Sequence, residues 1–155
     1  MREIKFRGRS IYSGEWFYGS LCHLDFNDGQ GDVCGSYITS LENRSEEVDD
    51  DTVGQFVGFL NKNGNDIYEG DIIRGIKTVA LPSWDGYGRD NKESGGNFNQ
   101  SSTIIGVVVL HINESKGYER SEYIIKSTNN HHFYEFDDFE KIGNIYENPE
   151  LLEGE

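Results

Sequence analysis

The sequence predicts a mainly β protein with an N-terminal antiparallel β segment, a small SH3-like barrel in its second half and a short C-terminal helix. Three observations lead to this fold class. The 155 residues include 19 glycines but only two prolines, which is typical of short strands joined by many turns. No apolar pattern with the helical period of 3.6 persists for three turns. Asn63-Gly64, placed between short apolar runs, is a strong hairpin signal.

Residues 1–60 are expected to form the N-terminal β segment. Extended stretches are expected at Ile4, Phe6, 11–18, 21–26 and 33–41. A turn is expected at Ser13-Gly14, and a loop is expected at 27–31. The acidic stretch 42–52 is expected to be a solvated connection in which Asp51 and Thr52 cap one helical turn. The chain could thus hold one domain over 1–155 with subdomains 1–60 and 61–155.

Residues 61–155 are expected to form the barrel-like half. A hairpin pairs 58–60 with 66–68 through a type I′ turn at Asn63-Gly64. Further strands are expected at 72–81, 104–112, 123–126 and 133–139, and a flexible polar loop is expected over 82–103. Asn148 and Pro149 predict a short helix near the C-terminal end. This order of elements is the basis for predicting an SH3-like barrel, which assigns no function.

The charge composition excludes one broad class of function. The chain has 28 acidic and 14 basic residues and a net charge of −14, which argues against general nucleic-acid binding. A local anion site near Arg2, Lys5, Arg7 and Arg9 stays open. No apolar run approaches the roughly 20 residues that span a bilayer, and no signal peptide is recognised. We therefore expect a cytoplasmic protein that makes no contact with a membrane.

One cluster of acidic residues has the atoms of a metal site. Asp66, Glu69 and Asp71 lie close together in the sequence. The calcium-loop spacing fails, however, because aligning Gly64 with the invariant glycine puts Phe59 at the first ligand position. The favoured interpretation is that Asp71 accepts hydrogen bonds from turn amides. No metal ligand is assigned.

The cysteines and histidines raise the separate question of zinc. Cys22, His23 and Cys34, with His131 and His132, contain suitable donor atoms. Their spacing lacks a C-x₂-C or H-x₃-H pair, and adjacent histidines on a strand point to opposite faces. The sequence therefore predicts two buried, free thiols in a reducing compartment and no cofactor.

Catalytic patterns are sparse. The chain has no G-x-S-x-G elbow, P-loop or dinucleotide-binding pattern. A dyad of Cys34 and His111 stays open, because the distance between two such residues cannot be read from sequence. No catalytic residue is assigned, and an enzymatic function is the less favoured class.

Two stretches could form binding surfaces, although ordinary packing or solvation also explains each of them. Trp16, Phe17 and Tyr18, beside Arg7 and Arg9, could stack nucleic-acid bases, but packing within the N-terminal sheet explains them more simply. The acidic runs 42–51 and 135–155 could mimic the phosphates of DNA, although acidic runs are usually solvated faces.

Three blocks of the sequence resemble the YopX family of phage and prophage proteins. These blocks are 2–8 with 14–19, 52–58 running into Asn63-Gly64 and 67–72, and 142–152. Residues 81–102 depart from the family pattern, because they are longer and more polar. The resemblance implies a phage or prophage origin and a β-rich fold. It places the expected cytoplasm in a bacterial host cell, implies no established activity and offers no catalytic residues to transfer.

The leading functional hypothesis is a non-enzymatic phage accessory protein that binds a host protein and self-associates into a homo-oligomer. Exposed hairpins would supply the strand edges for pairing between copies. One alternative is an acidic, DNA-mimicking inhibitor of a host nucleic-acid-binding protein. The other is a hydrolase that acts on a host molecule.

Overall fold

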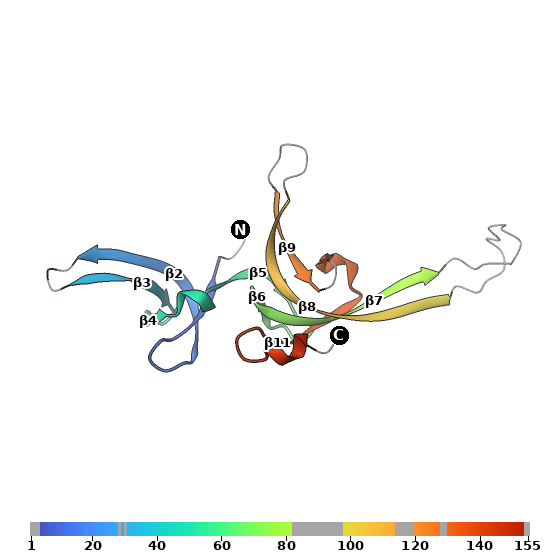
Figure 1. Ribbon diagram of the computed structural model, residues 1–155, viewed down its shortest axis with the longest axis horizontal. Coiled ribbons are helices and arrows are strands. Elements are labelled where there is room, and N and C mark those ends of the chain that lie inside the picture. The colour runs from blue at the N-terminus through green and yellow to red at the C-terminus, as the bar shows by residue number, and fades with distance from the viewer. Residues whose placement is uncertain are drawn as a thin grey trace, which may run out of the picture.

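The protein is built from two antiparallel sheets, as the computed structural model shows (Figure 1). The structure describes residues 4–27, 29, 31–81, 98–113, 120–127 and 130–153. Within these residues the helical elements are all 3-10 helices, and no α-helix occurs. The prediction of a mainly β fold is confirmed.

The first sheet has six strands in the order β4-β3-β2-β1-β5-β6. The strands are β1 (Phe6–Arg9), β2 (Trp16–Asn27), β3 (Asp32–Thr39), β4 (Ser45–Val48), β5 (Gly54–Leu60) and β6 (Asp66–Tyr68). The 3-10 helix η1 (Asp50–Thr52) leads from β4 into β5, and Asp49 caps it by accepting a hydrogen bond from the Asp51 amide at 3.1 Å. Strand β4 therefore lies within the acidic stretch 42–52, which was expected to be a connection.

The second sheet has five strands in the order β10-β9-β8-β7-β11. The strands are β7 (Asp71–Leu81), β8 (Phe98–Asn113), β9 (Arg120–Lys126), β10 (Asn130–His132) and β11 (Asp138–Asn144). The last strand, β11, returns to pair with β7. The described strands form an open sheet with β10 and β11 at its edges, so the closed SH3-like barrel expected from the sequence is not found among them.

The hydrophobic core joins the two sheets. Val57 from β5 and Ile67 from β6 are almost fully buried against side chains of the second sheet and of the 3-10 helix η3 (Phe133–Glu135). The remaining buried members of this cluster are Ile73, Val108, Ile125, Phe133 and Phe136. Burying branched and aromatic side chains is the main favourable term in folding, so the β5–β6 hairpin holds the two sheets together.

The hairpin between β5 and β6 exists, but its turn differs from the expected type I′. Asn61 and Asn65 close a three-residue loop, with the Gly64 amide donating to the Asn61 carbonyl at 2.9 Å. Within the loop 62–64, only Gly64 has a positive φ, of 79°, whereas a type I′ turn requires a positive φ at two successive residues. The Asn61 side chain accepts hydrogen bonds from the amides of Asn63 and Asn65, both at 2.9 Å, which explains the wider loop.

Two other elements differ from the sequence prediction. Residues 133–139, expected to be a strand, contain η3 before β11 begins at Asp138. The C-terminal helix is the 3-10 helix η4 (Pro149–Leu152), and Asn148 makes no side-chain cap. Of the loop expected over 82–103, residues 82–97 lie outside the described part, and residues 98–103 belong to β8. The strands expected at 72–81 and 104–112 are confirmed within β7 and β8.

Three two-stranded ribbons project from the joined sheets in different directions (Figure 1). In the β2–β3 ribbon, β4 pairs only with residues 36–39 of β3. In the β7–β8 ribbon, β11 covers residues 71–76 of β7. In the β8–β9 ribbon, β10 reaches only residues 124–126 of β9. The outer part of each ribbon therefore has no third strand among the described residues.

Candidate binding groove

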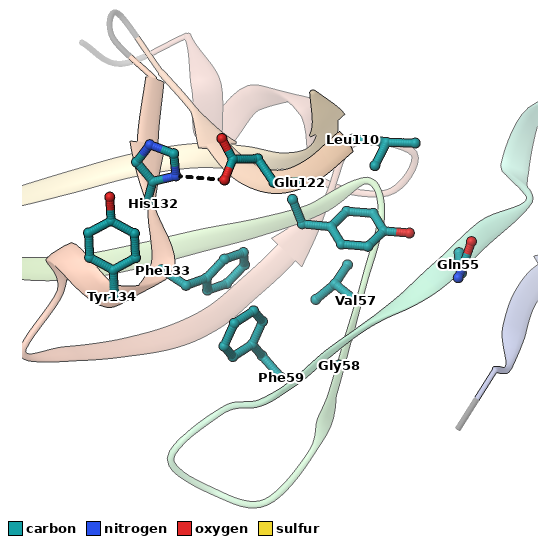
Figure 2. Close-up of a pocket in the computed structure, with 10 residues that line it drawn as sticks. Gln55, Val57, Gly58, Phe59, Leu110, Glu122, His132, Phe133 and Tyr134 are labelled. Carbon is teal, nitrogen blue, oxygen red and sulfur yellow. Dashed lines mark ion pairs between the residues drawn. The ribbon is translucent and has the colours of Figure 1, made fainter. Parts of the chain in front are cut away.

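An open groove of about 630 Å³ lies where β5 crosses the second sheet (Figure 2). Its floor includes Val57 and Phe133, which are 3% and 5% exposed. Phe59 of β5, Leu110 of β8 and Tyr134 of η3 also line it, and they are 44%, 47% and 82% exposed. The groove therefore presents large apolar side chains to solvent above a buried apolar floor.

Two stacked ring pairs line this groove. Phe59 lies on Phe133 with ring centroids 4.5 Å apart and planes 13° apart. Tyr134 lies on His132 with centroids 5.0 Å apart and planes 11° apart. All four residues line the groove, and Figure 2 labels each of them. Such packing restricts the rings and leaves flat aromatic surfaces available for contact.

Glu122 of β9 supplies a carboxylate to the groove. Its Oε2 lies 3.5 Å from Nδ1 of His132, and the two side chains are 30% and 31% exposed. An imidazole balances a carboxylate fully only when it is protonated. With a neutral His132, the groove therefore carries a negative charge beside its aromatic surface.

Glu135 fixes η3, and with it the position of Tyr134. Its Oε1 accepts a hydrogen bond from the His132 amide at 3.0 Å, and its Oε2 lies 2.5 Å from Nζ of Lys77. The hydrogen bond from Lys77, followed by that from the His132 amide, lowers the pKa of Glu135 to about 2. The carboxylate therefore stays ionised at neutral pH and ties η3 to β7.

Away from the groove, a buried ion pair joins the two sheets. Nη1 of Arg7, on β1, lies 2.5 Å from Oδ1 of Asp71, on β7, and the two side chains are 1% and 0% exposed. Lys141 of β11 places Nζ 2.9 Å from the same oxygen. The other Asp71 oxygen accepts a hydrogen bond from the Tyr68 amide at 2.9 Å. Asp71 thus meets two cations and one backbone amide.

The Arg7 guanidinium is also enclosed by aromatic rings. It lies 4.7 Å from the ring centroid of Trp16 and 5.3 Å from that of Tyr68. Its Nη2 donates to the Glu69 carbonyl at 2.9 Å. Trp16 is held in place by donating through Nε1 to Glu147 at 3.0 Å. Aromatic faces attract a cation most strongly when water is excluded, as it is here.

Comparison with known proteins gives the family. The family model described as YopX protein matches residues 5–153. The chain belongs to the YopX family. No curated protein matches it. A solved structure that is similar is the protein EF1440 from Enterococcus faecalis, with 23% sequence identity, 98% of this chain and 99% of that chain covered, and a TM-score of 0.37.

The acidic trio considered as a metal site is dispersed in this YopX family protein. Asp66 pairs with Lys5 at 2.6 Å, and the Glu69 side chain accepts from the Gln55 amide at 2.9 Å. The prediction that Asp71 accepts from a turn amide is confirmed by its bond from Tyr68. Throughout the part of the chain that the structure describes, no group of three His, Cys, Asp or Glu side chains could hold a metal ion.

The cysteines and histidines considered for zinc lie in different sheets. Cys22 and Cys34 are on β2 and β3, whereas His131 and His132 are on β10. Both thiols are free, as expected, but both are exposed, so the prediction that they are buried is wrong. The reason is that they lie on the projecting β2–β3 ribbon, where neither face is covered by the core.

The dyad of Cys34 and His111, which the sequence leaves open, would also span the two sheets. Cys34 pairs with Asp25 on the β2–β3 ribbon, whereas His111 pairs with Glu122 on the β8–β9 ribbon. The side chain of His111 lies outside the described part of the structure. Cys34 and His111 therefore lie on separate ribbons.

Some of the aromatic and acidic side chains considered as binding surfaces make contacts within the protein. Trp16 and Tyr18 contact Tyr146 and Tyr68 with ring centroids 5.7 and 5.6 Å apart, which confirms packing for these two rings. Arg9 does not join them and donates instead to the Gly14 carbonyl at 2.7 Å. In the acidic run, Glu46 and Glu47 accept hydrogen bonds from the hydroxyls of Ser10 and Tyr12 at 2.5 and 2.8 Å, whereas 49–51 are exposed.

Sequence reasoning did not find the groove. Phe59, Glu122 and Tyr134 are far apart in the chain, and each sits in a stretch that resembles an ordinary strand or turn. The proximity of Tyr134 and Phe59 depends on β5 crossing from one sheet to the other, which no local pattern encodes. The structure also has no helix, among its described residues, long and apolar enough to cross a membrane.

Proposed function

We propose that this YopX family protein is a phage or prophage accessory protein that acts in the bacterial cytoplasm by binding proteins, copies of itself included, rather than by catalysis. The family resemblance supports the phage origin. The observation that carries the binding function is the set of three two-stranded ribbons, whose outer parts lack a third strand among the described residues. These outer parts would supply the contacts for self-association.

Two-stranded ribbons are marginally stable in water, and unpaired strand edges are templates for pairing. Among the ribbon side chains that the structure describes, most of the exposed ones are uncharged. Ile76 on β7 is 44% exposed and Leu110 on β8 is 47% exposed, and Cys22 and Cys34 are exposed on the β2–β3 ribbon. Pairing with a ribbon of a second copy would add backbone hydrogen bonds and cover this surface. A symmetric dimer needs only one such self-complementary contact.

Analytical ultracentrifugation over a range of protein concentrations tests this function. We expect reversible association that strengthens with added salt, because salt screens the repulsion between chains of net charge −14. A chain that remains a strict monomer at high concentration would contradict the self-association.

A shortened variant locates the contact. Replacing residues 25–34 by Asn-Gly keeps Leu24 opposite Gly35 and preserves the part of β3 that β4 covers. If the β2–β3 ribbon is the contact, this variant stays monomeric while its thermal unfolding is little changed, since it loses no core residue. In the full chain, Cys34→Lys should weaken association and Cys34→Ser, the matched control, should not.

A further inference from the structure

We propose that the groove binds an extended, proline-containing segment of a partner protein, and that a Lys or Arg side chain of this segment pairs with Glu122. The inference rests on the protein-binding part of the proposed function but not on self-association. It assigns to the groove a ligand class: a basic peptide in a polyproline II conformation.

The aromatic surface argues for an extended peptide that contains proline. The stacked pairs Phe59–Phe133 and His132–Tyr134 hold their rings in place before any ligand arrives. Flat, fixed aromatic surfaces suit proline rings, and a polyproline II segment loses little entropy on binding because it is already extended. Tyr134 is 82% exposed, so its ring has most of its area available for such a contact.

The floor of the groove supports the same assignment. Val57 and Phe133 belong to the buried core, so the floor is rigid and apolar. A rigid, preformed surface binds an extended ligand without a large ordering cost of its own. Leu110, 47% exposed, extends the apolar surface along β8. The groove therefore offers area for several apolar ligand side chains.

Charge selects a basic segment. Glu122 is 30% exposed beside the groove, and its close neighbour is an imidazole, 3.5 Å away, that is charged only when protonated. A cationic ligand side chain would complete this pairing, and the chain's net charge of −14 attracts basic partners over longer distances. A second copy fits less well at this place, because it has twice as many acidic as basic residues.

Fluorescence anisotropy with labelled synthetic peptides tests the assignment. The probes place one arginine before, within or after a run of prolines and leucines. Two matched series replace arginine by the uncharged citrulline, or the prolines by alanine. We expect binding by at least one arginine-containing proline peptide, about fivefold weaker binding of its citrulline form, and weaker binding of its alanine form.

Two groove variants, each with a control elsewhere, assign the contacts. Tyr134→Ala should weaken binding by about tenfold or more, as loss of an aromatic anchor does, and Tyr12→Ala is its control at 76% exposure outside the groove. Glu122→Gln should remove the difference between the arginine and citrulline peptides. Glu42→Gln, an exposed carboxylate paired with Arg44, should retain that difference.

Several results would overturn the proposal. These are no binding by any peptide, equal binding by the Tyr134→Ala variant, or an arginine preference that survives Glu122→Gln. Loss of self-association in Tyr134→Ala, measured by ultracentrifugation, would show that a second copy occupies the groove and would equally overturn it. A monomeric protein that binds the peptides would contradict self-association alone, so failures of the two proposals can be told apart.

Discussion

Arg7 and Asp71 form a buried ion pair, 2.5 Å between Nη1 and Oδ1, that connects the first strand of one sheet to the first strand of the other. Removing two charges from water is costly, and the cost is offset only where the remaining polar atoms find partners. Asp71 has Lys141 and the Tyr68 amide, and Arg7 has the Glu69 carbonyl, although the buried Nε of Arg7 has no hydrogen-bond partner among the described residues. This arrangement fixes where β1 lies against β7.

The first prediction is that replacing one member of this ion pair destabilises the fold more than replacing both members together. Arg7→Met or Asp71→Leu leaves a buried charge without its main partner, so each should lower the free energy of unfolding by about 3–5 kcal/mol. The double variant should lose much less than the sum of the two, because no unpaired charge of the pair remains. Urea denaturation of the four proteins measures the coupling.

The exposed pair of Arg44 and Glu42, with side chains 70% and 76% exposed, is the control for this cycle. Glu42→Gln should change the free energy of unfolding by less than about 0.5 kcal/mol. Strictly additive losses at Arg7 and Asp71 would contradict the prediction.

Local patterns in the sequence predict most strands but not the contacts between them. The β-branched runs of β7 and β8 and the Asn63-Gly64 hairpin all follow from side-chain preference and turn chemistry. The partner of Arg7 lies 64 positions away and is fixed only when both sheets assemble. From the sequence alone, an arginine near the N-terminus is expected at the surface, because its burial depends on how the two sheets assemble.

Physical causes also explain where the sequence predictions differ from the structure. The type I′ turn gives way to a wider loop because the Asn61 side chain offers the backbone an alternative hydrogen-bond acceptor. The thiols were expected to be buried because free cysteine usually is, but residues that lie on a projecting ribbon do not reach a core. The groove depends on where β5 crosses the second sheet, which is a property of the tertiary fold.

The second prediction concerns stability against pH. The pKa of Glu135 in the folded protein, about 2, lies below its ordinary value of 4.5, so ionised Glu135 stabilises the fold above pH 4.5 and this contribution is lost as the pH falls toward 2. Glu135→Gln should therefore lower the free energy of unfolding by about 1 kcal/mol at pH 7, and the difference from the parent protein should shrink toward pH 2.

Lys77→Met separates the causes of this effect. The hydrogen bond from Lys77 is the largest cause of the lowered pKa, so this variant should lose most of the pH-dependent difference while retaining the bond from the His132 amide. Chemical denaturation at a series of pH values gives both results. A difference between Glu135→Gln and the parent that is constant from pH 7 to pH 2 would rule out the assignment.

The third prediction concerns close packing at Gly75. A methyl group at this position would overlap the ring of Phe136, which is 9% exposed in the core. Gly75→Ala should lower the free energy of unfolding by about 1–3 kcal/mol, as overpacking does. Gly31→Ala, where nothing lies within 4 Å of the added methyl, is the control and should be nearly neutral. Equal effects at the two glycines, measured by thermal unfolding, would contradict this packing.

The fourth prediction concerns the thiols on the β2–β3 ribbon. Cys22 and Cys34 are exposed and free, so both should react with a thiol reagent such as DTNB in the absence of denaturant. Cys22→Ser and Cys34→Ser distinguish the two thiols, and reaction only after unfolding would contradict their exposure. If copies associate through this ribbon, labelling should also slow as the protein concentration rises, because the contact would cover the thiols. A labelling rate that is independent of concentration, in a protein that does associate, would place the contact on another ribbon.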